Sequence, residues 1–548
     1  MTQVDRRVEQ VSDQLLSDPP RPPEPIEPPP GDGGLDRSVL LVAGVVVLGA
    51  IMSILDITVV SVGLQTFQSV FQATSAQVAW TMTGYTLALA SVIPLTGWAA
   101  DRFGTKRLYM LALLLFTLGS ALCATAGNLE TLVAWRVVQG LGGGMLMPLG
   151  MTILTRAAGP ERIGRVMAVL GIPMLLGPIF GPILGGWLID AASWHWIFLI
   201  NVPIGAIALV YASKVLPRDD VEPSESFDLV GMLLLSPGLA AFLYGVSSIP
   251  SAGTVADTKV LAWMLTGLVL IIAFVPWALR PANRHPLIDL RLFRIRTMTV
   301  AVIAMALFAI AFFGASLLFP LYFQQVRHES ALDSGLLLAP QGIGAMLTMP
   351  FAGVLADRIG PGKVVLTGLV VDTIGLGMFT QLGSGTSYPY ILASLFVMGL
   401  GMGATMMPIM TAALATLTNQ NVARGSTLLN TTQQVASSIG TALFSVLLTN
   451  GVRSHDVAST YVGLQQRLGS LDGGALAAAK DRIAALAGTA LPQLGDAYAQ
   501  VFVVATVLIA LCLVPAYFLP RRKQQPAPVS DEAGPTAASE RPPAMVGH

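Results

Sequence analysis

The stretch GWAADRFGTK (Gly97–Lys106) decides the fold, because the other half of this 548-residue chain contains a second copy, GVLADRIGPGK (Gly353–Lys363). Both copies place a glycine, the triplet Ala-Asp-Arg and a further glycine at identical offsets. A looser pair of matching stretches lies downstream, GLGGGMLMP (Gly140–Pro148) and GLGMGATMMP (Gly399–Pro408). The repeat predicts a chain built from two related halves.

The composition around these repeats is that of a polytopic membrane protein. Hydrophobic residues make up 53% of the chain and charged residues 11%, and the mean hydropathy is +0.68. A soluble protein of this length carries far more charge. Apolar runs of roughly 18 residues or more recur, and each predicts a membrane-spanning helix whose backbone groups pair within their own segment. Because the runs are continuous and do not alternate with polar residues, an all-α protein is expected and a β-barrel is excluded.

The apolar runs predict fourteen spans. Their approximate ranges are 38–62, 77–100, 108–126, 130–155, 164–189, 195–213, 229–247, 258–279, 298–323, 334–356, 363–382, 388–415, 428–450 and 497–519. Each Ala-Asp-Arg triplet follows the second span of its half, so the order is six spans, two inserted spans and six more. Parallel repeats with a substrate path between the halves are a transporter architecture.

This order predicts five parts of the chain. They are a disordered tail 1–37, a six-helix bundle 38–213, a connector with two inserted helices 214–297, a second six-helix bundle 298–519 and a tail 520–548. The second bundle includes a long external loop, 451–495, whose composition predicts a helix resting on the outer face, with a binding lid as the alternative.

Charge sets the predicted orientation. Most of the 31 Lys and Arg residues fall in the tails and the even-numbered loops, so both termini are predicted to be cytoplasmic. The formal net charge is zero and the largest basic block is RRK (Arg521–Lys523), which gives no reason to expect nucleic-acid binding. The two cysteines, Cys123 and Cys512, show no metal or redox spacing, so no cofactor is expected.

Five stretches together resemble the fourteen-span drug:proton antiporters of the major facilitator superfamily, the EmrB/QacA type. They are LDITVV (55–60), GWAADRFGTKR (97–107), RVVQGLGGG (136–144), GIPMLLGPIFGPILGG (171–186) and WHWIFLINVPIG (194–205). The resemblance implies a monomer in a bacterial plasma membrane that exports lipophilic, cationic or amphipathic drugs in exchange for protons, by alternating access. The alternatives are a dedicated exporter of an endogenous lipid, siderophore or metabolite on the same fold, and a membrane enzyme. No HExxH, GxSxG or P-loop motif supports the enzyme.

An acid and a base lie inside predicted spans, Asp56 in the first and Arg136 in the fourth. The helical rise puts both roughly 9 to 12 Å below the outer face, where they can pair. Either charge alone would be costly in lipid. The pair is either a fixed structural contact or, as the resemblance implies, the site of proton exchange. A third intramembrane residue, Asp372, is a further candidate for proton coupling, although its span is expected to lie away from the central cavity.

Two groups of residues are expected to control the conformational change. At the predicted cytoplasmic rim, the resemblance implies a latch across the two bundles, made by Gly97, Asp101, Arg102 and Arg107, with a degenerate copy at Asp357 and Arg358. In the fifth span, small residues and prolines favour close but movable helix contact over a static wall. These residues are Gly171, Pro173, Gly177, Pro178, Gly181, Pro182, Gly185 and Gly186.

Candidate cavity residues follow from their positions on the spans that surround the predicted substrate path. They are Met52, Tyr85, Gln139, Phe313, Gln341, Met406, Asn430 and Gln434. Polarisable methionines and flat aromatic rings suit varied ligands.

Overall fold

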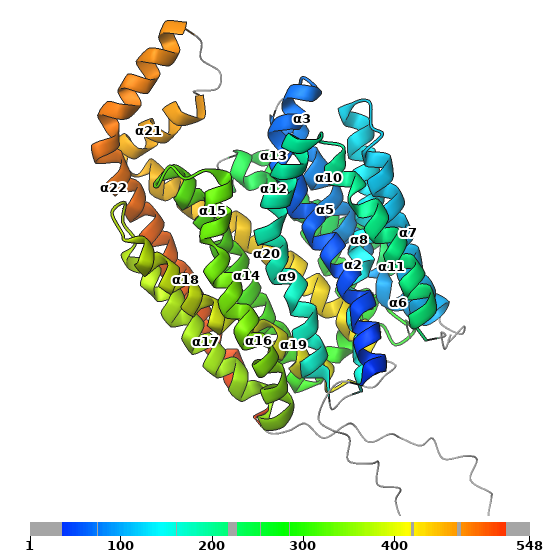
Figure 1. Ribbon diagram of the computed structural model, residues 1–548. Helices are drawn as coiled ribbons and strands as arrows, with labels where there is room; N and C mark the ends of the chain where they lie inside the picture. Colours follow the sequence, from blue (N-terminus) through cyan, green and yellow to red (C-terminus); the bar gives the residue numbers. More distant parts are fainter. Residues whose placement is uncertain are drawn as a thin grey trace, which may run out of the picture. The chain divides into compact units, whose positions relative to one another are not determined.

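The computed structural model describes residues 36–521, except 74, 160–161, 218–226, 253, 284, 418–420 and 468–472. The two predicted tails and much of the predicted connector after residue 217 therefore lie outside the described residues. Every regular element in the described part is helical. Figure 1 shows these helices coloured along the chain.

In the first half, the described residues form ten helices. They are α2 (Arg37–Val62), α3 (Leu64–Val70), α4 (Ser75–Val78), α5 (Trp80–Val92), α6 (Leu95–Phe103), α7 (Thr105–Cys123), α8 (Leu129–Ala158), α9 (Ile163–Ala191), α10 (Trp196–Leu199) and α11 (Asn201–Val215). Two inserted helices follow, α12 (Leu229–Ala252) and α13 (Thr258–Ala278). They pack on each other, and α12 also contacts α5 and α20.

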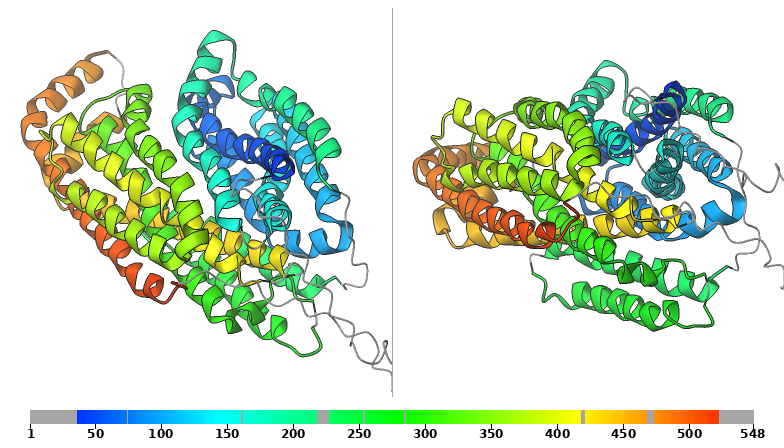
Figure 2. Two further views of the ribbon diagram at one scale, coloured as in Figure 1. Left: turned by 60° about the horizontal axis from the view of Figure 1, so that its bottom comes forward. Right: turned by 90° about the horizontal axis from the view of Figure 1, so that it is seen from below.

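The second half begins after a short 3-10 turn. Its elements are η1 (Leu290–Arg294), α14 (Arg296–Gln325), α15 (Ala331–Leu337), α16 (Ala339–Ile359), α17 (Pro361–Met378), η2 (Phe379–Gln381), α18 (Tyr388–Gly403), α19 (Met406–Leu414), α20 (Val422–Arg453), α21 (Asp456–Arg467), α22 (Gly473–Leu511) and α23 (Leu513–Tyr517). Seen from below in Figure 2, the two halves are separate bundles, with the green inserted pair beside both.

The sequence repeat reappears in the backbone and in the packing. Gly104 and Gly360 end α6 and α16 with φ angles of 92° and 95°, a conformation that glycine adopts at little cost. Each glycine turns the chain directly into the next helix. The pairs α5–α8 and α7–α8 in the first half correspond to α16–α18 and α17–α18 in the second. The predicted two-bundle, all-α fold is confirmed.

Twelve helical segments in the described part of the chain are long and apolar enough to cross a membrane. The predicted second span is instead two short helices, α5 and α6, separated at Ile93 and Pro94. The predicted fifth span is α9, in which several side chains lie outside the description. The count of fourteen therefore stays a prediction.

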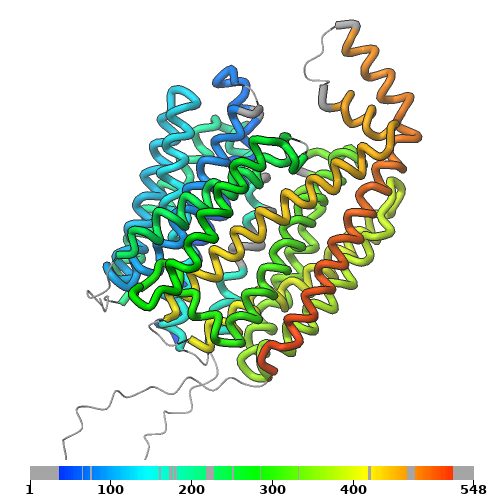
Figure 3. The backbone as a smooth tube through the Cα atoms, turned by 180° about the vertical axis from the view of Figure 1, so that it is seen from behind, coloured from blue at the N-terminus to red at the C-terminus, as the bar shows by residue number. Residues whose placement is uncertain are grey.

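The predicted external loop takes a different form from the one expected. α22 is one helix of 39 residues that runs directly into the final span. At 1.5 Å per residue it is about 58 Å long, far more than the roughly 30 Å of a bilayer core. Its first part packs against α21 and stands clear of the bundle at the top of Figure 1 and in the rear view of Figure 3. The prediction that this segment forms a separate helix resting on the outer face was wrong. The Ala-rich segment instead continues the last span as one unbroken helix.

Candidate functional site

The structure brings Asp56 of α2 and Arg136 of α8 into direct contact. Arg136 Nη1 lies 2.5 Å from Asp56 Oδ2, and each residue is only 1% exposed. A charge-assisted hydrogen bond of this kind is much stronger than a neutral one. The shared depth expected from the sequence thus corresponds to a buried ion pair.

Two amide side chains complete the surroundings of the acid. Asp56 Oδ1 accepts a hydrogen bond from Gln139 Nε2 at 2.7 Å and one from Asn201 Nδ2 at 3.3 Å. Gln139 Oε1 in turn accepts from Arg136 Nη1 at 2.7 Å, and both amides also donate to Ser120 Oγ. Because these groups all donate to Asp56, the arrangement fits the ionised carboxylate. Protonation would remove its negative charge and weaken the contact with Arg136.

A tyrosine connects this pair to the space between the two halves. The Arg136 guanidinium lies 4.2 Å from the centre of the Tyr85 ring, and Arg136 Nε donates to the Thr81 carbonyl at 3.0 Å. The Tyr85 hydroxyl is 3.3 Å from Ser53 Oγ and lies against Gly143. Ser53 and Gly143 both line a cavity. Movement of Arg136 can therefore alter the cavity wall through one side chain, that of Tyr85.

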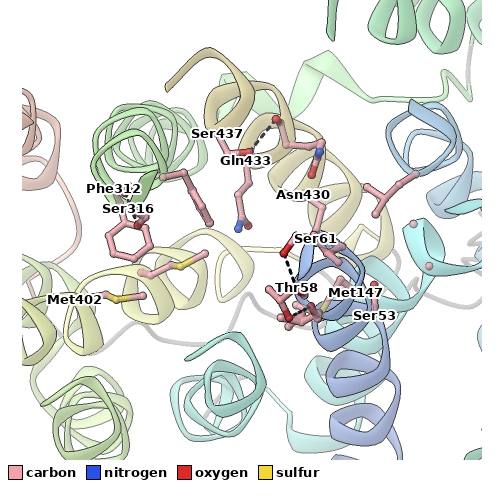
Figure 4. A pocket seen from close by; sticks show the side chains of 18 of the residues that line it. Ser53, Thr58, Ser61, Met147, Phe312, Ser316, Met402, Asn430, Gln433 and Ser437 are labelled. Carbon is pink, nitrogen blue, oxygen red and sulfur yellow. Dashed lines mark hydrogen bonds between the residues drawn. The ribbon is translucent and has the colours of Figure 1, made fainter. Parts of the chain in front are cut away.

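That cavity has a volume of about 430 Å³ and lies between the halves. Figure 4 shows side chains entering it from both halves. Its lining comes from α2, α5 and α8 on one side and from α14, α16, α18, α19 and α20 on the other, together with Ile93 and Leu338.

Five of the predicted cavity residues line this space, namely Phe313, Gln341, Met406, Asn430 and Gln434. Three do not. Gln139 and Tyr85 face the Asp56–Arg136 pair instead, because that pair lies within the first bundle and draws their polar groups to it. Met52 is buried in α2 outside the lining.

Sequence reasoning missed several lining residues and one partner of the acid. The missed lining includes Ser53, Met147, Phe312, Met402, Gln433 and Ser437. The sequence carried a signal for part of this lining, because Asn430, Gln434 and Ser437 have the spacing of residues on one helix face. Asn201 carried the same signal as Asp56, a polar residue in an apolar run, but was given no role.

At the opposite end of α2 from the ion pair, the two halves touch through the repeated Ala-Asp-Arg triplets; we call this the ADR end. Asp101 of α6 lies 3.4 Å from Arg156 of its own half and 3.8 Å from Arg424 of α20. Asp357 of α16 accepts from the Gly164 backbone N–H of α9 at 3.0 Å. Each repeated acid therefore contacts the first turn of a helix in the other half.

Of the other predicted latch residues, one lies at this contact between the halves and the others lie wholly or partly at the surface. A side chain at Gly97 would meet Thr427 and Arg424, so this glycine permits the close approach of α6 to α20. Arg107 and Arg358 are exposed, and Arg102 is partly exposed. Within the latch, therefore, Gly97, Asp101 and Asp357 lie at the contact between the two bundles.

Loss of the Asp101 charge is expected to loosen this end. For Asp101→Asn we expect a Thr427→Cys reporter, which lies at this contact, to label roughly fivefold faster, corresponding to about 1 kcal/mol of lost attraction. The measurement is thiol labelling in a Cys123→Ala/Cys512→Ala background, with Arg102→Gln as the charge control. Unchanged labelling together with unchanged transport would show that the motif does not act as a latch and only helps to set the orientation of the chain in the membrane.

The glycines of α9 face two partners. Cβ atoms added at Gly177, Gly181 and Gly185 would collide with Ile54, Thr58 and Val59 of α2, whereas one at Gly171 would collide with Met349 and Met407 of the second half. The helix is thus in close contact with α2 along one part and with the other bundle along another. Gly186 faces open space. The side chains of Pro173, Pro178 and Pro182 lie outside the described residues.

Bulk at Gly181 is expected to stop transport. Its neighbour Thr58 Oγ1 lies 3.1 Å from the Gly177 carbonyl oxygen, within hydrogen-bonding distance, so α2 and α9 are in close contact at this point. Gly181→Leu would separate the helices at a cost of about 1–3 kcal/mol. Gly186→Leu, which meets nothing within 4 Å, is the matched control and should stay active. Equal activity of the two variants would contradict a role for this contact.

Asp372 of α17 lies apart from this site. It is buried and does not line the cavity, and its Oδ2 has no hydrogen-bond partner among the described residues. Its Cα and Cβ lie against Gly401 of α18. The structure thus brings Asp56 and Arg136 together but places Asp372 on a helix of the second bundle that does not line the cavity.

Comparison with known proteins agrees with this geometry. The sequence profile of the Major Facilitator Superfamily matches residues 46–441. The chain belongs to this superfamily. It is 52% identical over 494 residues to the "Multidrug resistance protein B homolog" of Mycobacterium tuberculosis strain H37Rv, covering 89% of this chain and 91% of that protein. It is 31% identical over 435 residues to "Multidrug export protein EmrB" of Haemophilus influenzae, covering 79% and 84%. The resemblance to drug:proton antiporters is confirmed at the level of the family, and a transporter, not an enzyme, is indicated.

Solved structures share the fold at low identity. The human organic anion transporter MFSD10 gives a TM-score of 0.55 at 16% identity, with 87% of this chain and 100% of that chain covered. The proton:xylose symporter XylE gives 0.52 at 14% identity, with 86% and 95% covered. These likenesses agree with the fold of the superfamily.

Proposed function

We propose that this protein is a proton-coupled antiporter that exports lipophilic small molecules by alternating access. The observation that carries the proposal is the buried Asp56–Arg136 pair, which contacts the cavity between the halves through Tyr85 and Ser53. The names of the relatives from M. tuberculosis and H. influenzae, which refer to multidrug resistance and export, support drugs as the cargo.

The predicted orientation puts the ADR end in the cytoplasm of a bacterium, with both termini on that side. The contacts of Asp101 with Arg424 and of Asp357 with α9 then close the cytoplasmic side. Thr96 with Thr427, and Ser426 with the Pro148 carbonyl, add polar contacts between the halves. In this proposal, the conformation with these contacts is the one that faces outward. We also propose that the protein works as a single chain.

Proton exchange at Asp56 would drive the cycle. A proton from outside neutralises the carboxylate, so Arg136 loses its ion pair. Arg136 can then move against the Tyr85 ring. Because Tyr85 contacts Ser53 and Gly143 at the cavity wall, this movement changes the wall and promotes release of the cargo. Loss of the proton to the cytoplasm restores the ion pair and resets the site. Asp372 remains a second candidate for proton coupling.

Gradient-driven export from reconstituted vesicles tests the proposal. The purified chain in liposomes should move the fluorescent dyes ethidium or Nile red against their concentration gradient when a pH gradient is imposed, and should stop when a protonophore is added. Movement that ignores the pH gradient would contradict proton coupling. Failure to move any member of a dye and drug panel would favour a dedicated exporter of one metabolite.

A further inference from the structure

The cavity wall carries polar side chains but no charge. Among the described residues that line it there is no Asp, Glu, Lys, Arg or His. Asp56, the acid of the buried ion pair, does not line the cavity and already accepts from Arg136, Gln139 and Asn201. Its charge is therefore compensated within the first bundle and is not available to a ligand.

The hydroxyl groups of the wall are largely occupied by the protein itself. Ser61, Ser316 and Ser437 each donate to a carbonyl of their own helix at 2.7, 2.8 and 3.0 Å. Thr58 Oγ1 lies within hydrogen-bonding distance of carbonyls in α2 and α9, and Ser53 pairs with Tyr85. Their protons are thus already used, and the hydroxyls offer a ligand little donor capacity.

The amides of the wall are different. The side chains of Gln341, Gln433 and Gln434 are partly exposed and make no side-chain hydrogen bond to any other described residue. Asn430 Nδ2 contacts the Ser426 carbonyl and Met151 Sδ, which leaves its Oδ1 free to accept. Figure 4 shows Gln433 reaching from α20 into the space beside Asn430. Each glutamine amide provides two donor hydrogens and one acceptor oxygen.

The wall formed by α14, α18 and α19 is apolar apart from Ser316, and it carries aromatic rings. Phe312 and Phe313 of α14 have ring centres 5.3 Å apart at an interplanar angle of 80°, and Phe319 lies further along the same helix. Met402 and Met406 complete this wall. Aromatic rings favour stacked or edge contacts with other rings, and methionine adapts to their shape.

We infer that this cavity selects uncharged, flat amphiphiles that carry a carbonyl or amide group, in preference to organic cations. The ring system would pack against the Phe and Met wall, and its polar group would bind the free amides of α20 and α16. A cation would lose its hydration with no counter-charge in the wall, and attraction to phenyl rings recovers only part of that loss. The volume of about 430 Å³ fits one drug-sized molecule. This inference deepens, and rests on, the proposed export function of the same cavity.

A matched pair of dyes tests the inference. Nile red is neutral and carries a ring carbonyl, whereas Nile blue has nearly the same ring system with a cationic iminium group in that place. Equilibrium binding to the full-length purified protein is measured by fluorescence, and export is measured in liposomes under a pH gradient. We expect wild type to prefer Nile red in both assays. Binding needs no gradient, so it separates selectivity from coupling.

Two substitutions at Gln433 sharpen the test. Gln433→Leu should weaken Nile red binding about three- to tenfold, the effect of one lost hydrogen bond, with little change for Nile blue. Gln433→Glu adds a negative charge at nearly constant shape and should shift the binding ratio at least about tenfold towards Nile blue. Gln381→Leu and Gln381→Glu, at an exposed glutamine outside the cavity, are the controls and should change neither dye.

Several outcomes would overturn the inference. Equal or stronger binding of Nile blue by wild type, or an unchanged ratio in Gln433→Glu, contradicts selection for neutral ligands, as does binding of neither dye. Gradient-driven export of Nile blue in preference to Nile red would contradict the inferred selectivity but support the proposed antiporter. Selective binding of Nile red without gradient-driven export would support the inferred selectivity and contradict the proposed antiporter.

Discussion

Asp56→Asn is expected to abolish proton-driven export while leaving ligand binding in place. The amide has nearly the shape of the carboxyl group but cannot take up or release a proton. Asp56 accepts from three donors in the first bundle, so the change affects charge more than packing. Export from liposomes under a pH gradient should fall to the level of protein-free vesicles, and Asp56→Glu should retain part of the activity.

The controls for this substitution separate coupling from folding. Asp496→Asn removes an acid from the exposed face of α22 and should behave as wild type. Binding of Nile red to Asp56→Asn should stay within a few-fold of wild type. If Asp56→Asn still pumps against a concentration gradient with the wild-type dependence on pH, Asp56 is only a structural partner of Arg136, and coupling must be sought first at Asp372.

Arg136→Gln is expected to reduce both stability and transport, for a different reason. It leaves Asp56 as a buried acid without its base, and breaking such a pair costs about 3–5 kcal/mol. That is a large share of the roughly 5–15 kcal/mol that stabilises a typical domain. Thermal unfolding of the purified protein should therefore begin at a clearly lower temperature than in wild type.

The double variant Asp56→Asn/Arg136→Gln distinguishes the two effects. It removes both charges together, so the uncompensated acid is gone and most of the lost stability should return. Export should nevertheless stay absent, because no group is left to exchange the proton. Recovery of export in the double variant would show that the pair serves only to hold α2 and α8 together.

The sequence predicted the fold well where a signal was local and strong. Long apolar runs and the repeated Ala-Asp-Arg triplet led to two helical bundles, and an acid and a base at one depth led to the Asp56–Arg136 contact. The continuation of α22 beyond the bundle was missed, since an Ala-rich helix has the same composition whether it lies flat or extends a span.

The cavity was harder to predict, because its lining depends on how each helix is rotated. Tyr85 and Gln139 lie on helices that border the cavity, yet they turn towards the ion pair, where their polar groups find partners. Asp357 and Arg358 were expected to form a degenerate copy of the latch, and the sequence indicated no partner for Asp357, which accepts from the first turn of α9. Only the packing of the two halves shows this partner, since Gly164 is distant in sequence.

The most direct test of the account is proton movement caused by the cargo itself. Liposomes that contain the purified chain and a pH-sensitive dye receive Nile red without any imposed gradient, and the internal pH is followed in wild type and in Asp56→Asn. The account predicts a proton flux opposite to the movement of Nile red in wild type and none in the variant. Transport of Nile red by wild type with no accompanying proton flux would contradict it.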